Sequence, residues 1–321
     1  MRPQHCFVTG GAGFIGSNLV DRLLAAGVRV TAYDNFSTGF REFLEGALRH
    51  PDFRLVEGDL LDAEALRGAM AGADFVYHLA ANADVRFGTH HPRRDLEQNT
   101  LATFEVLEAM RANGIRGLAF ASTGSVYGEP EVFPTPEDCP FPVQTSLYAA
   151  SKLACEGLIQ AYVTGFGFQG YIFRFVSVLG ERYTHGHVFD FYFRLKRNPQ
   201  ALHILGDGHQ RKSYMDIQDC ITAMLLAVDR AEGPLSIFNL GVDDTIEVNQ
   251  SVAWITEYLG VTPRLTCEGG RRGWIGDSPF IHLDTRKIRA LGWSPERSIR
   301  DGVVRTLAWL EANPWVERRR A

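Results

Sequence analysis

The sequence predicts an α/β protein, in which helices cover both faces of a doubly wound parallel sheet and a smaller mixed α/β lobe follows. Three observations support this prediction. Short apolar runs alternate with longer helical patterns through about the first 180 residues. A glycine-rich turn joins the first run to the first helical pattern. The 321 residues are enough for two domains and can bury a core without disulfides or metal.

The apolar runs of the first half define six strands. Strands of a parallel sheet are buried on both faces, so they are apolar throughout instead of alternating. The expected strands are residues 6–9, 28–34, 54–57, 75–79, 118–122 and 171–178. The helices expected between them are residues 14–26, 95–112 and 147–166. The Pro-rich stretch 129–142 is expected to be a surface excursion.

After Gly180 the pattern becomes less regular. A helix over residues 188–196, a strand over 202–205, a Gly-Asp-Gly turn and a helix over 217–229 indicate a smaller lobe. Residues 235–240 again resemble a core strand. We therefore expect a first domain over residues 1–180, which the strand near 235–240 rejoins, and a second lobe made mainly of residues 181–321.

Composition excludes several classes of protein. The 33 Lys and Arg against 38 Asp and Glu give a net charge of −5, whereas nucleic-acid and anionic-membrane binders show a basic excess. No apolar run approaches the ~20 residues of a membrane span, and no leader peptide is expected, because strand-like residues begin at His5. The five cysteines are widely spaced, which indicates neither a disulfide framework nor a metal site. We expect a cytoplasmic protein without nucleic-acid, membrane or metal partners.

The first turn has the composition of a phosphate-binding loop. Gly10, Gly13 and Gly16 lie between the first strand and the first helix, where glycines let the backbone approach a pyrophosphate at the helix N-terminus. No Lys-Ser/Thr pair follows, which excludes an ATP-type loop. Asp34, eighteen residues after Gly16, would accept hydrogen bonds from an adenosine ribose and repel a 2′-phosphate. This favours NAD over NADP. The alternative for the glycine loop is a plain tight turn between a strand and a helix, without a bound phosphate. Asp59 is either an adenine-side contact or a structural turn residue.

Tyr148 and Lys152 are the candidate catalytic pair. They lie four residues apart in a predicted helix and therefore share one face. A nearby ammonium and a bound nicotinamide cation would lower the tyrosine pKa from about 10. The alternative is a surface tyrosine beside a solvated lysine. Ser122, Thr123 and Ser125 end the fifth strand, where hydroxyls could hold a substrate hydroxyl and relay its proton, or could simply form a hydroxyl-rich turn.

These motifs together resemble a known family. The chain is similar to the extended short-chain dehydrogenase/reductases of Rossmann fold and, within them, to the NAD-dependent sugar-nucleotide epimerases, especially UDP-glucose 4-epimerases. The resemblance extends from Cys6 to about Leu310. It is carried by the glycine loop, Asp34-Asn35, Gly58-Asp59-Leu60, His78-Leu79-Ala80-Ala81, residues 122–128, Tyr148-x-x-x-Lys152 and Gly206-Asp207-Gly208.

The resemblance implies a role for each of these residues. Tyr148 would take the proton from the sugar 4-hydroxyl while hydride leaves C4 for NAD⁺, Lys152 would bind the nicotinamide ribose, and Thr123 would bridge the sugar hydroxyl and Tyr148. The implied cofactor contacts, besides Tyr148 and Lys152, are Gly10, Gly13, Phe14, Ile15, Gly16, Asp34, Asn35, Ser37, Gly39, Asp59, Leu60, Leu79, Ala80, Ala81, Asn99 and Ser122.

The resemblance also implies a substrate site in the second lobe. Lys212 stands where the family usually has an arginine, with Arg211 as an alternative, and Arg272 is the expected diphosphate ligand. For both basic clusters the alternative is a solvated surface. The implied substrate contacts are Ser125, Ser177, Arg182, His187, Val188, Arg211, Lys212, Arg272 and Asp277.

Departures from the family pattern narrow the function. Dehydratases carry an Asp-Glu pair after the threonine, whereas this chain has Gly124-Ser125. We therefore expect C4 epimerisation of a UDP-sugar, first of all UDP-glucose and UDP-galactose. Alternatives are UDP-glucuronate, for which Arg182 is the candidate carboxylate partner, UDP-N-acetylhexosamines, and a non-catalytic NAD-binding regulator. The family's habit predicts a homodimer through helices 95–112 and 147–166, although their apolar residues could equally face the protein's own core.

Overall fold

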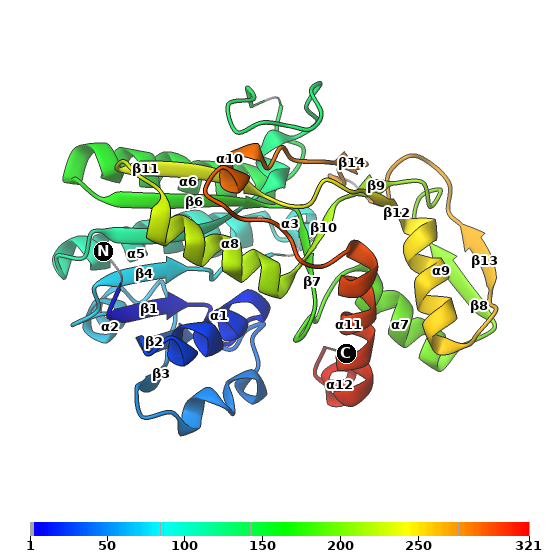
Figure 1. The fold of residues 1–321 in the computed structure, drawn as a ribbon, viewed down its shortest axis with the longest axis horizontal. Helices are drawn as coiled ribbons and strands as arrows, with labels where there is room; N and C mark the ends of the chain where they lie inside the picture. Colours follow the sequence, from blue (N-terminus) through cyan, green and yellow to red (C-terminus); the bar gives the residue numbers. More distant parts are fainter. Residues whose placement is uncertain (1–2, 84, 86, 142, 275, 321) are drawn as a thin grey trace.

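The computed structural model describes residues 3–83, 85, 87–141, 143–274 and 276–320. A seven-stranded sheet in the order β11-β6-β5-β4-β1-β2-β3 forms its larger half, and every neighbouring pair is parallel (Figure 1). The strands are β1 (His5–Thr9), β2 (Arg29–Asp34), β3 (Phe53–Glu57), β4 (Phe75–His78), β5 (Gly117–Thr123), β6 (Gln169–Phe175) and β11 (Leu235–Leu240).

The strand order places a reversal point beside β1. The chain runs outward from β1 through β2 to β3, and then returns to the other side of β1 with β4. Thr9 and His78 are register partners at the carboxyl ends of β1 and β4, and Thr9 Oγ1 lies 2.7 Å from His78 Nδ1. Ligands of doubly wound sheets bind at such reversals, outside the carboxyl ends of the strands. The predicted fold class is confirmed.

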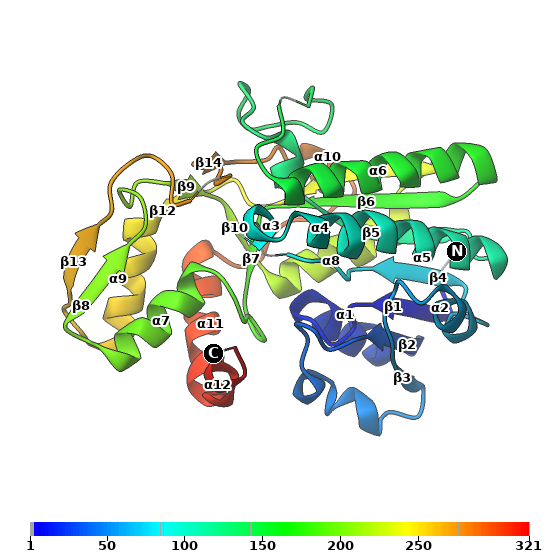
Figure 2. The ribbon, with the colours of Figure 1, turned by 180° about the vertical axis from the view of Figure 1, so that it is seen from behind.

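Helices bury both faces of this sheet, as the front and back views show (Figures 1 and 2). One face carries α1 (Phe14–Ala25) and α8 (Ile217–Arg230), and the other carries α2 (Ala63–Ala69), α5 (Ala102–Ala112) and α6 (Leu147–Phe166). Each layer has its own apolar core: Leu19 and Ile221 are buried in the first, and Val106 and Ile159 in the second. Burial on both faces explains the apolar character of the central strands β4, β5 and β6, whereas the edge strand β3 is only partly buried.

The second lobe lies beside the carboxyl ends of the strands (Figure 1). Its helices are α7 (His187–Arg197), α9 (Val248–Leu259), α11 (Ile299–Ala312) and α12 (Trp315–Arg320). Its short strands are β7 (Ser177–Leu179), β8 (Ala201–Ile204), β9 (Arg211–Lys212), β10 (Tyr214–Asp216), β12 (Ile246–Glu247), β13 (Arg264–Cys267) and β14 (Phe280–Ile281). The domain boundary near residue 180 stays a prediction.

Short helices complete the chain. They are η1 (Arg41–Leu44), η2 (Ala47–Arg49), α3 (Phe87–His90), α4 (Pro92–Asp95), η3 (Leu96–Leu101), η4 (Gly124–Tyr127) and α10 (Arg286–Arg289). No helix in the part of the chain that the structure describes is both long and apolar enough to cross a bilayer.

The single strand predicted over residues 171–178 is wrong. β6 ends at Phe175, and β7 pairs with β10 in a separate two-stranded sheet. β6 is buried from Gly170 to Phe175, whereas β7 begins with the exposed Ser177 and is buried only at Leu179. Which strand each one pairs with depends on segments far away in the sequence, so a local pattern cannot separate them.

The helix predicted over residues 95–112 is interrupted. η3 is a π-helix, and regular α-helix resumes only in α5. The buried Asn99 lies in this wider turn, where its Oδ1 accepts from Asn82 N at 2.8 Å and its Nδ2 donates to Ser151 Oγ at 2.8 Å. Such π-turns are frequent at functional sites, and this one packs against α6, the helix that carries Tyr148 and Lys152.

Candidate active site

A cavity of about 360 Å³ opens at the carboxyl ends of the central strands. The turn between β1 and α1, the segments that follow β2, β4, β5 and β6, and the start of α6 all contribute to its wall. Sequence segments far apart therefore meet at the reversal point of the sheet, where such folds bind ligands.

The glycine loop leaves a cradle at the N-terminus of α1. Gly10 has a φ of 67°, and a Cβ there would lie 2.7 Å from Ala80 N, while a Cβ on Gly16 would collide with the Gly10 carbonyl oxygen. Gly13 caps α1 without a side-chain hydrogen bond and lines the cavity together with Phe14. The first N–H groups of the helix thus open onto the cavity, which suits a diphosphate.

Asp34 lies at the end of β2 and lines the same cavity. Its Oδ2 accepts from Ala12 N at 2.9 Å, and its Oδ1 accepts from Phe36 N at 2.8 Å. Burial raises the pKa of this carboxyl group, and the two backbone N–H groups oppose that rise. The carboxylate is therefore fixed between the glycine loop and the segment after β2, as an adenosine-ribose acceptor requires. Asn35 continues this edge and donates to Asp59 Oδ2 at 3.1 Å.

Tyr148 and Thr123 meet in the cavity. Tyr148 is in the first turn of α6, whose N-cap Ser146 accepts from Ala149 N at 3.1 Å, and Thr123 ends β5. The side chains of Tyr148 and Thr123 share a hydrogen bond. This geometry gives the phenol a hydroxyl neighbour through which a proton could pass.

The expected lowering of the Tyr148 pKa is not produced by the protein's own groups. Burial raises the Tyr148 pKa to about 12, and the hydrogen bond with Thr123 opposes this only in part. Lys152 is itself buried, and its Nζ lies 4.2 Å from the centroid of the Phe120 ring. Burial lowers the pKa of Lys152 to about 8. Desolvation thus dominates the pKa of Tyr148, and the group that lowers this pKa is Thr123, not Lys152.

The structure brings most of the expected cofactor residues to the cavity wall. Those that line it are Gly10, Gly13, Phe14, Ile15, Gly16, Asp34, Asn35, Ser37, Leu60, Leu79, Ala80, Ala81 and Ser122, together with Thr123, Ser125, Tyr148 and Ser177. Asp59 accepts from the wall residue Asn35, Asn99 accepts from Asn82 N, and Gly39 packs against the Ala12 backbone.

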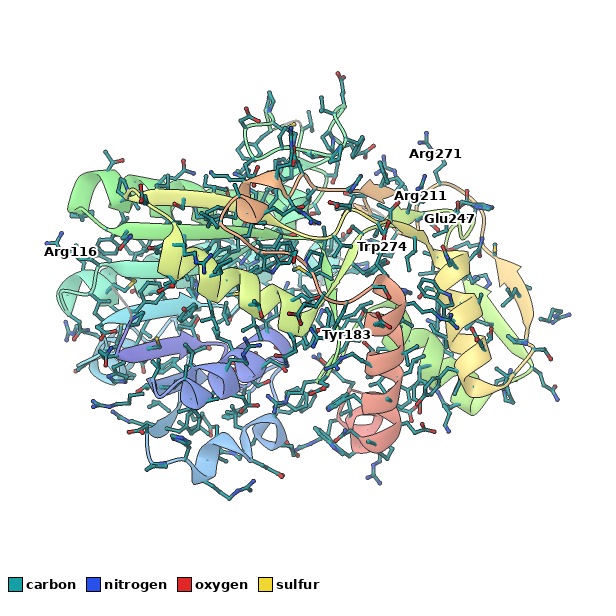
Figure 3. The ribbon with its side chains drawn as sticks, viewed as in Figure 1. Arg116, Tyr183, Arg211, Glu247, Arg271 and Trp274 are labelled. Carbon is teal, nitrogen blue, oxygen red and sulfur yellow. The ribbon has the colours of Figure 1, made fainter. Side chains whose placement is uncertain are left out.

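The basic side chains expected to bind the substrate do not line the cavity, and each contacts another group of the protein. Lys212 Nζ is 2.6 Å from Asp277 Oδ1, Arg272 Nη2 is 2.5 Å from Glu129 Oε1, and Arg211 Nη2 donates to Thr245 Oγ1 at 2.9 Å. Figure 3 shows Arg211 with Trp274 beside β9 and β14, whereas Tyr183 lies nearer the sheet, between it and α11. The Lys212 ammonium also lies 4.9 Å from the Trp274 ring centroid.

Three other expected substrate residues do not line the cavity. Arg182 Nη2 forms an ion pair with Asp21 Oδ2 at 2.6 Å, away from the cavity lining. His187 Nε2 lies 2.8 Å from Ser251 Oγ, and Val188 is completely buried. Their roles in substrate binding stay predictions.

Sequence reasoning missed several residues of the cavity wall: Thr38, Tyr183, Thr184, His185 and Arg320. Thr38 stands only four residues after Asp34, so its closeness to Asp34 in the sequence could have predicted it as a wall residue. The segment 183–185 and Arg320 carry no local motif. They reach the cavity only because the second lobe folds back against the sheet.

Comparison with known proteins agrees with this geometry. Residues 6–241 match the model of the NAD dependent epimerase/dehydratase family. A UDP-glucose 4-epimerase from Corynebacterium glutamicum is 33% identical over 313 residues, which cover 91% of each chain. A crystal structure of a UDP-galactose 4-epimerase is 36% identical with a TM-score of 0.87, over 97% of this chain and 100% of that one. The Thermus thermophilus UDP-glucose 4-epimerase in complex with NAD is 32% identical with a TM-score of 0.86, over 96% and 99%.

Proposed function

This chain belongs to the NAD dependent epimerase/dehydratase family, and from that premise we propose that it inverts C4 of a UDP-sugar, interconverting UDP-glucose and UDP-galactose. The observation that carries the proposal is the hydrogen-bonded pair of Tyr148 and Thr123 inside a dinucleotide-type cavity. A phenol that can take a proton, beside a hydroxyl that can orient a sugar, is what oxidation of a secondary alcohol needs.

The residues of the cavity fit NAD. The free N–H groups at the start of α1 and the glycines before it suit the diphosphate, and Asp34 suits the adenosine ribose while repelling a 2′-phosphate. Lys152, one helical turn after Tyr148, would hold the nicotinamide ribose. When bound, NAD supplies the acceptor and later the donor of the C4 hydride.

The protein's own groups handle the proton. Tyr148 takes the proton of the 4-hydroxyl as that carbon is oxidised, and it returns the proton when the 4-keto sugar is reduced on the opposite face. Thr123 holds the same oxygen and keeps it within reach of the phenol. A phenolate is needed for the first step, and the positive nicotinamide is the charge that can offset the desolvation of Tyr148. Lys212 and Arg272 are proposed to hold the UDP diphosphate.

Two neighbouring residues argue for epimerisation over dehydration. Gly124 and Ser125 follow Thr123 directly, and neither can ionise near neutral pH. Elimination of water across C5 and C6 needs an acid and a base beside the ketone. A uronic-acid substrate is less favoured because Arg182, its candidate carboxylate partner, is paired with Asp21.

We also propose that the enzyme is a cytoplasmic homodimer. Leu96 and Leu101 on η3, Phe104 on α5 and Phe166 on α6 are exposed apolar side chains along the two helices expected to form the dimer contact. All five cysteines are unpaired, which fits a reducing compartment. Light scattering of the purified protein should give twice the mass of the chain, and a monomer would contradict the dimer.

The proposed reaction is tested with UDP-glucose, UDP-N-acetylglucosamine and UDP-glucuronate, each incubated with the protein in deuterated water. We expect NMR to show UDP-galactose from UDP-glucose, without deuterium at C5, because 4-epimerisation leaves the C5–H bond intact. Deuterium at C5, or a product lighter by one water, would identify a dehydratase instead. Turnover of only one of the other two sugars would reassign the substrate.

A further inference from the structure

The segment that follows Asp34 separates two cavities. A second cavity of about 660 Å³ lies on the other side of this segment, lined by Phe36–Phe40, parts of η1, and two arginines of α12. Ser37, Thr38 and Arg320 belong to the walls of both cavities. Arg320 therefore lies between the two cavities, and we call this point the mouth of the dinucleotide cavity.

The helix α12 is anchored on this segment by aromatic packing. The Trp315 ring centroid lies 5.6 Å from that of Phe40 and 5.9 Å from that of Phe43, and Val316 is completely buried. Arg319 adds a partly exposed ion pair with Glu42, Nη2 to Oε1 2.6 Å. This packing holds the end of the second lobe against the loop that follows the adenosine-binding strand.

Arg320 joins the two sides of the opening. Its Nη2 donates to the Thr184 side-chain oxygen at 2.8 Å and to the Thr38 carbonyl oxygen at 3.2 Å. Its guanidinium carbon lies 5.5 Å from the Phe40 ring centroid. Thr38 follows β2, whereas Thr184 precedes α7, so a single side chain links the sheet half to the second lobe across the mouth of the cavity.

The cavity wall carries few charged side chains. Among the described residues that line the cavity, Arg320 is the only Lys or Arg, and Asp34 is the only carboxylate. A dinucleotide brings a doubly negative diphosphate into this space, and a guanidinium is well suited to a diphosphate.

We propose that Arg320 is a cofactor-retaining residue, which closes the mouth of the site and places its positive charge toward the diphosphate of bound NAD. The inference rests on the NAD site of the proposed function and adds a residue from the far end of the chain to it. NAD can then leave only after Arg320 releases Thr38 and Thr184, so Arg320 governs the rate of cofactor dissociation.

The test uses protein loaded with labelled NAD⁺ and chased with excess unlabelled NAD⁺. We expect Arg320→Ala to raise the dissociation rate about tenfold. Arg320→Gln keeps an N–H donor group but loses both the charge and the length with which the guanidinium joins Thr38 to Thr184, so it should raise the rate nearly as much. In the wild type the rate should increase with salt, because the side chain is exposed to solvent, and this dependence should be weaker in both variants.

Two neighbouring arginines are matched controls. Arg318→Ala removes an equal charge from the same helix, and Arg319→Ala removes the exposed pair with Glu42 while Trp315 and Val316 still anchor α12. Both should leave the dissociation rate within twofold of the wild type. An equal effect of Arg319→Ala, or unchanged dissociation in Arg320→Ala or Arg320→Gln, would overturn the inference.

The outcomes separate this inference from the proposed function. Wild-type protein that holds no dinucleotide would contradict both. Wild-type protein that holds NAD and releases it at the same rate as the Arg320 variants would contradict only the role of Arg320. Unfolding curves of the variants check that the fold is retained.

Discussion

The Arg174 guanidinium lies against the Glu156 carboxylate, Nη2 to Oε2 2.7 Å, with side-chain exposures of only 2% and 0%. Glu156 belongs to α6, the helix of Tyr148 and Lys152, and it also accepts from Ser122 Oγ at 2.5 Å. Arg174 belongs to β6. The pair therefore links α6 to β6, next to Ser122 near the end of β5.

We expect Glu156→Gln to destabilise the fold by about 3–5 kcal/mol, because it leaves the Arg174 charge buried without a counter-charge. Urea unfolding should show this as a lower midpoint. Glu257→Gln, which breaks an exposed pair with Arg300, is the control and should change stability by less than about 1 kcal/mol. Equal effects of the two substitutions would contradict the importance of burial.

His78 makes stability depend on pH. It is buried between Thr9 Oγ1 and Thr103 Oγ1, at 2.7 and 2.9 Å, and burial lowers its pKa from 6.5 to about 3. Below pH 6.5 the unfolded chain binds a proton that the folded protein does not, so stability falls as the pH drops from 6.5 toward 3. The slope from this group approaches roughly 1.4 kcal/mol per pH unit.

The variant His78→Gln tests this dependence by denaturant unfolding between about pH 7 and pH 4. Its stability should fall less steeply than that of the wild type, by about the slope of one proton. Identical slopes for the two proteins would show that His78 takes up its proton in the folded state.

Asp34 should set the preference for NAD over NADP. Its carboxylate is held by Ala12 N and Phe36 N at the edge of the cavity, where a 2′-phosphate would meet it. We expect Asp34→Ala to bring the two dissociation constants closer by about tenfold, which corresponds to roughly 1.4 kcal/mol. Calorimetric titration with each cofactor measures both. Equal binding by the unmodified protein would refute this assignment.

Tyr148→Phe should reduce turnover by about 10²–10⁴-fold while NAD and UDP-sugar binding persist, since only one oxygen is lost. The difference between the absorbance titrations of the wild type and of Tyr148→Phe reports the ionisation of the Tyr148 phenol alone. Without NAD⁺ it should ionise near pH 12, and bound NAD⁺ should shift that ionisation to lower pH through its positive charge. Residual turnover above a few per cent would exclude Tyr148 as the base.

Local chemistry made the centre of the site predictable. A turn that must approach a diphosphate needs residues without Cβ, an acid at the end of the second strand follows from the spacing, and residues four apart on a helix share a face. The sequence thus pointed to Gly10, Gly16, Asp34 and Tyr148, which line the cavity. Lys152 is buried one turn farther along α6 and is not among the residues of the cavity wall, so its role stays a prediction. The fold class followed from the alternation of apolar runs and helical patterns.

The remaining features of the site depend on contacts between residues that are far apart in the sequence. Arg320 bonds to a carbonyl 282 residues earlier, and β7 leaves the main sheet to pair with β10. Burial, which no short segment specifies, raised the pKa of Tyr148 instead of lowering it. Such contacts form only when the helices have packed on the sheet, because the position of each residue depends on all the helices and strands that lie between the two residues in the sequence. The sequence therefore determined what kind of site this is. The tertiary packing determined that Arg320 reaches the cavity wall, and it determined the pKa of Tyr148.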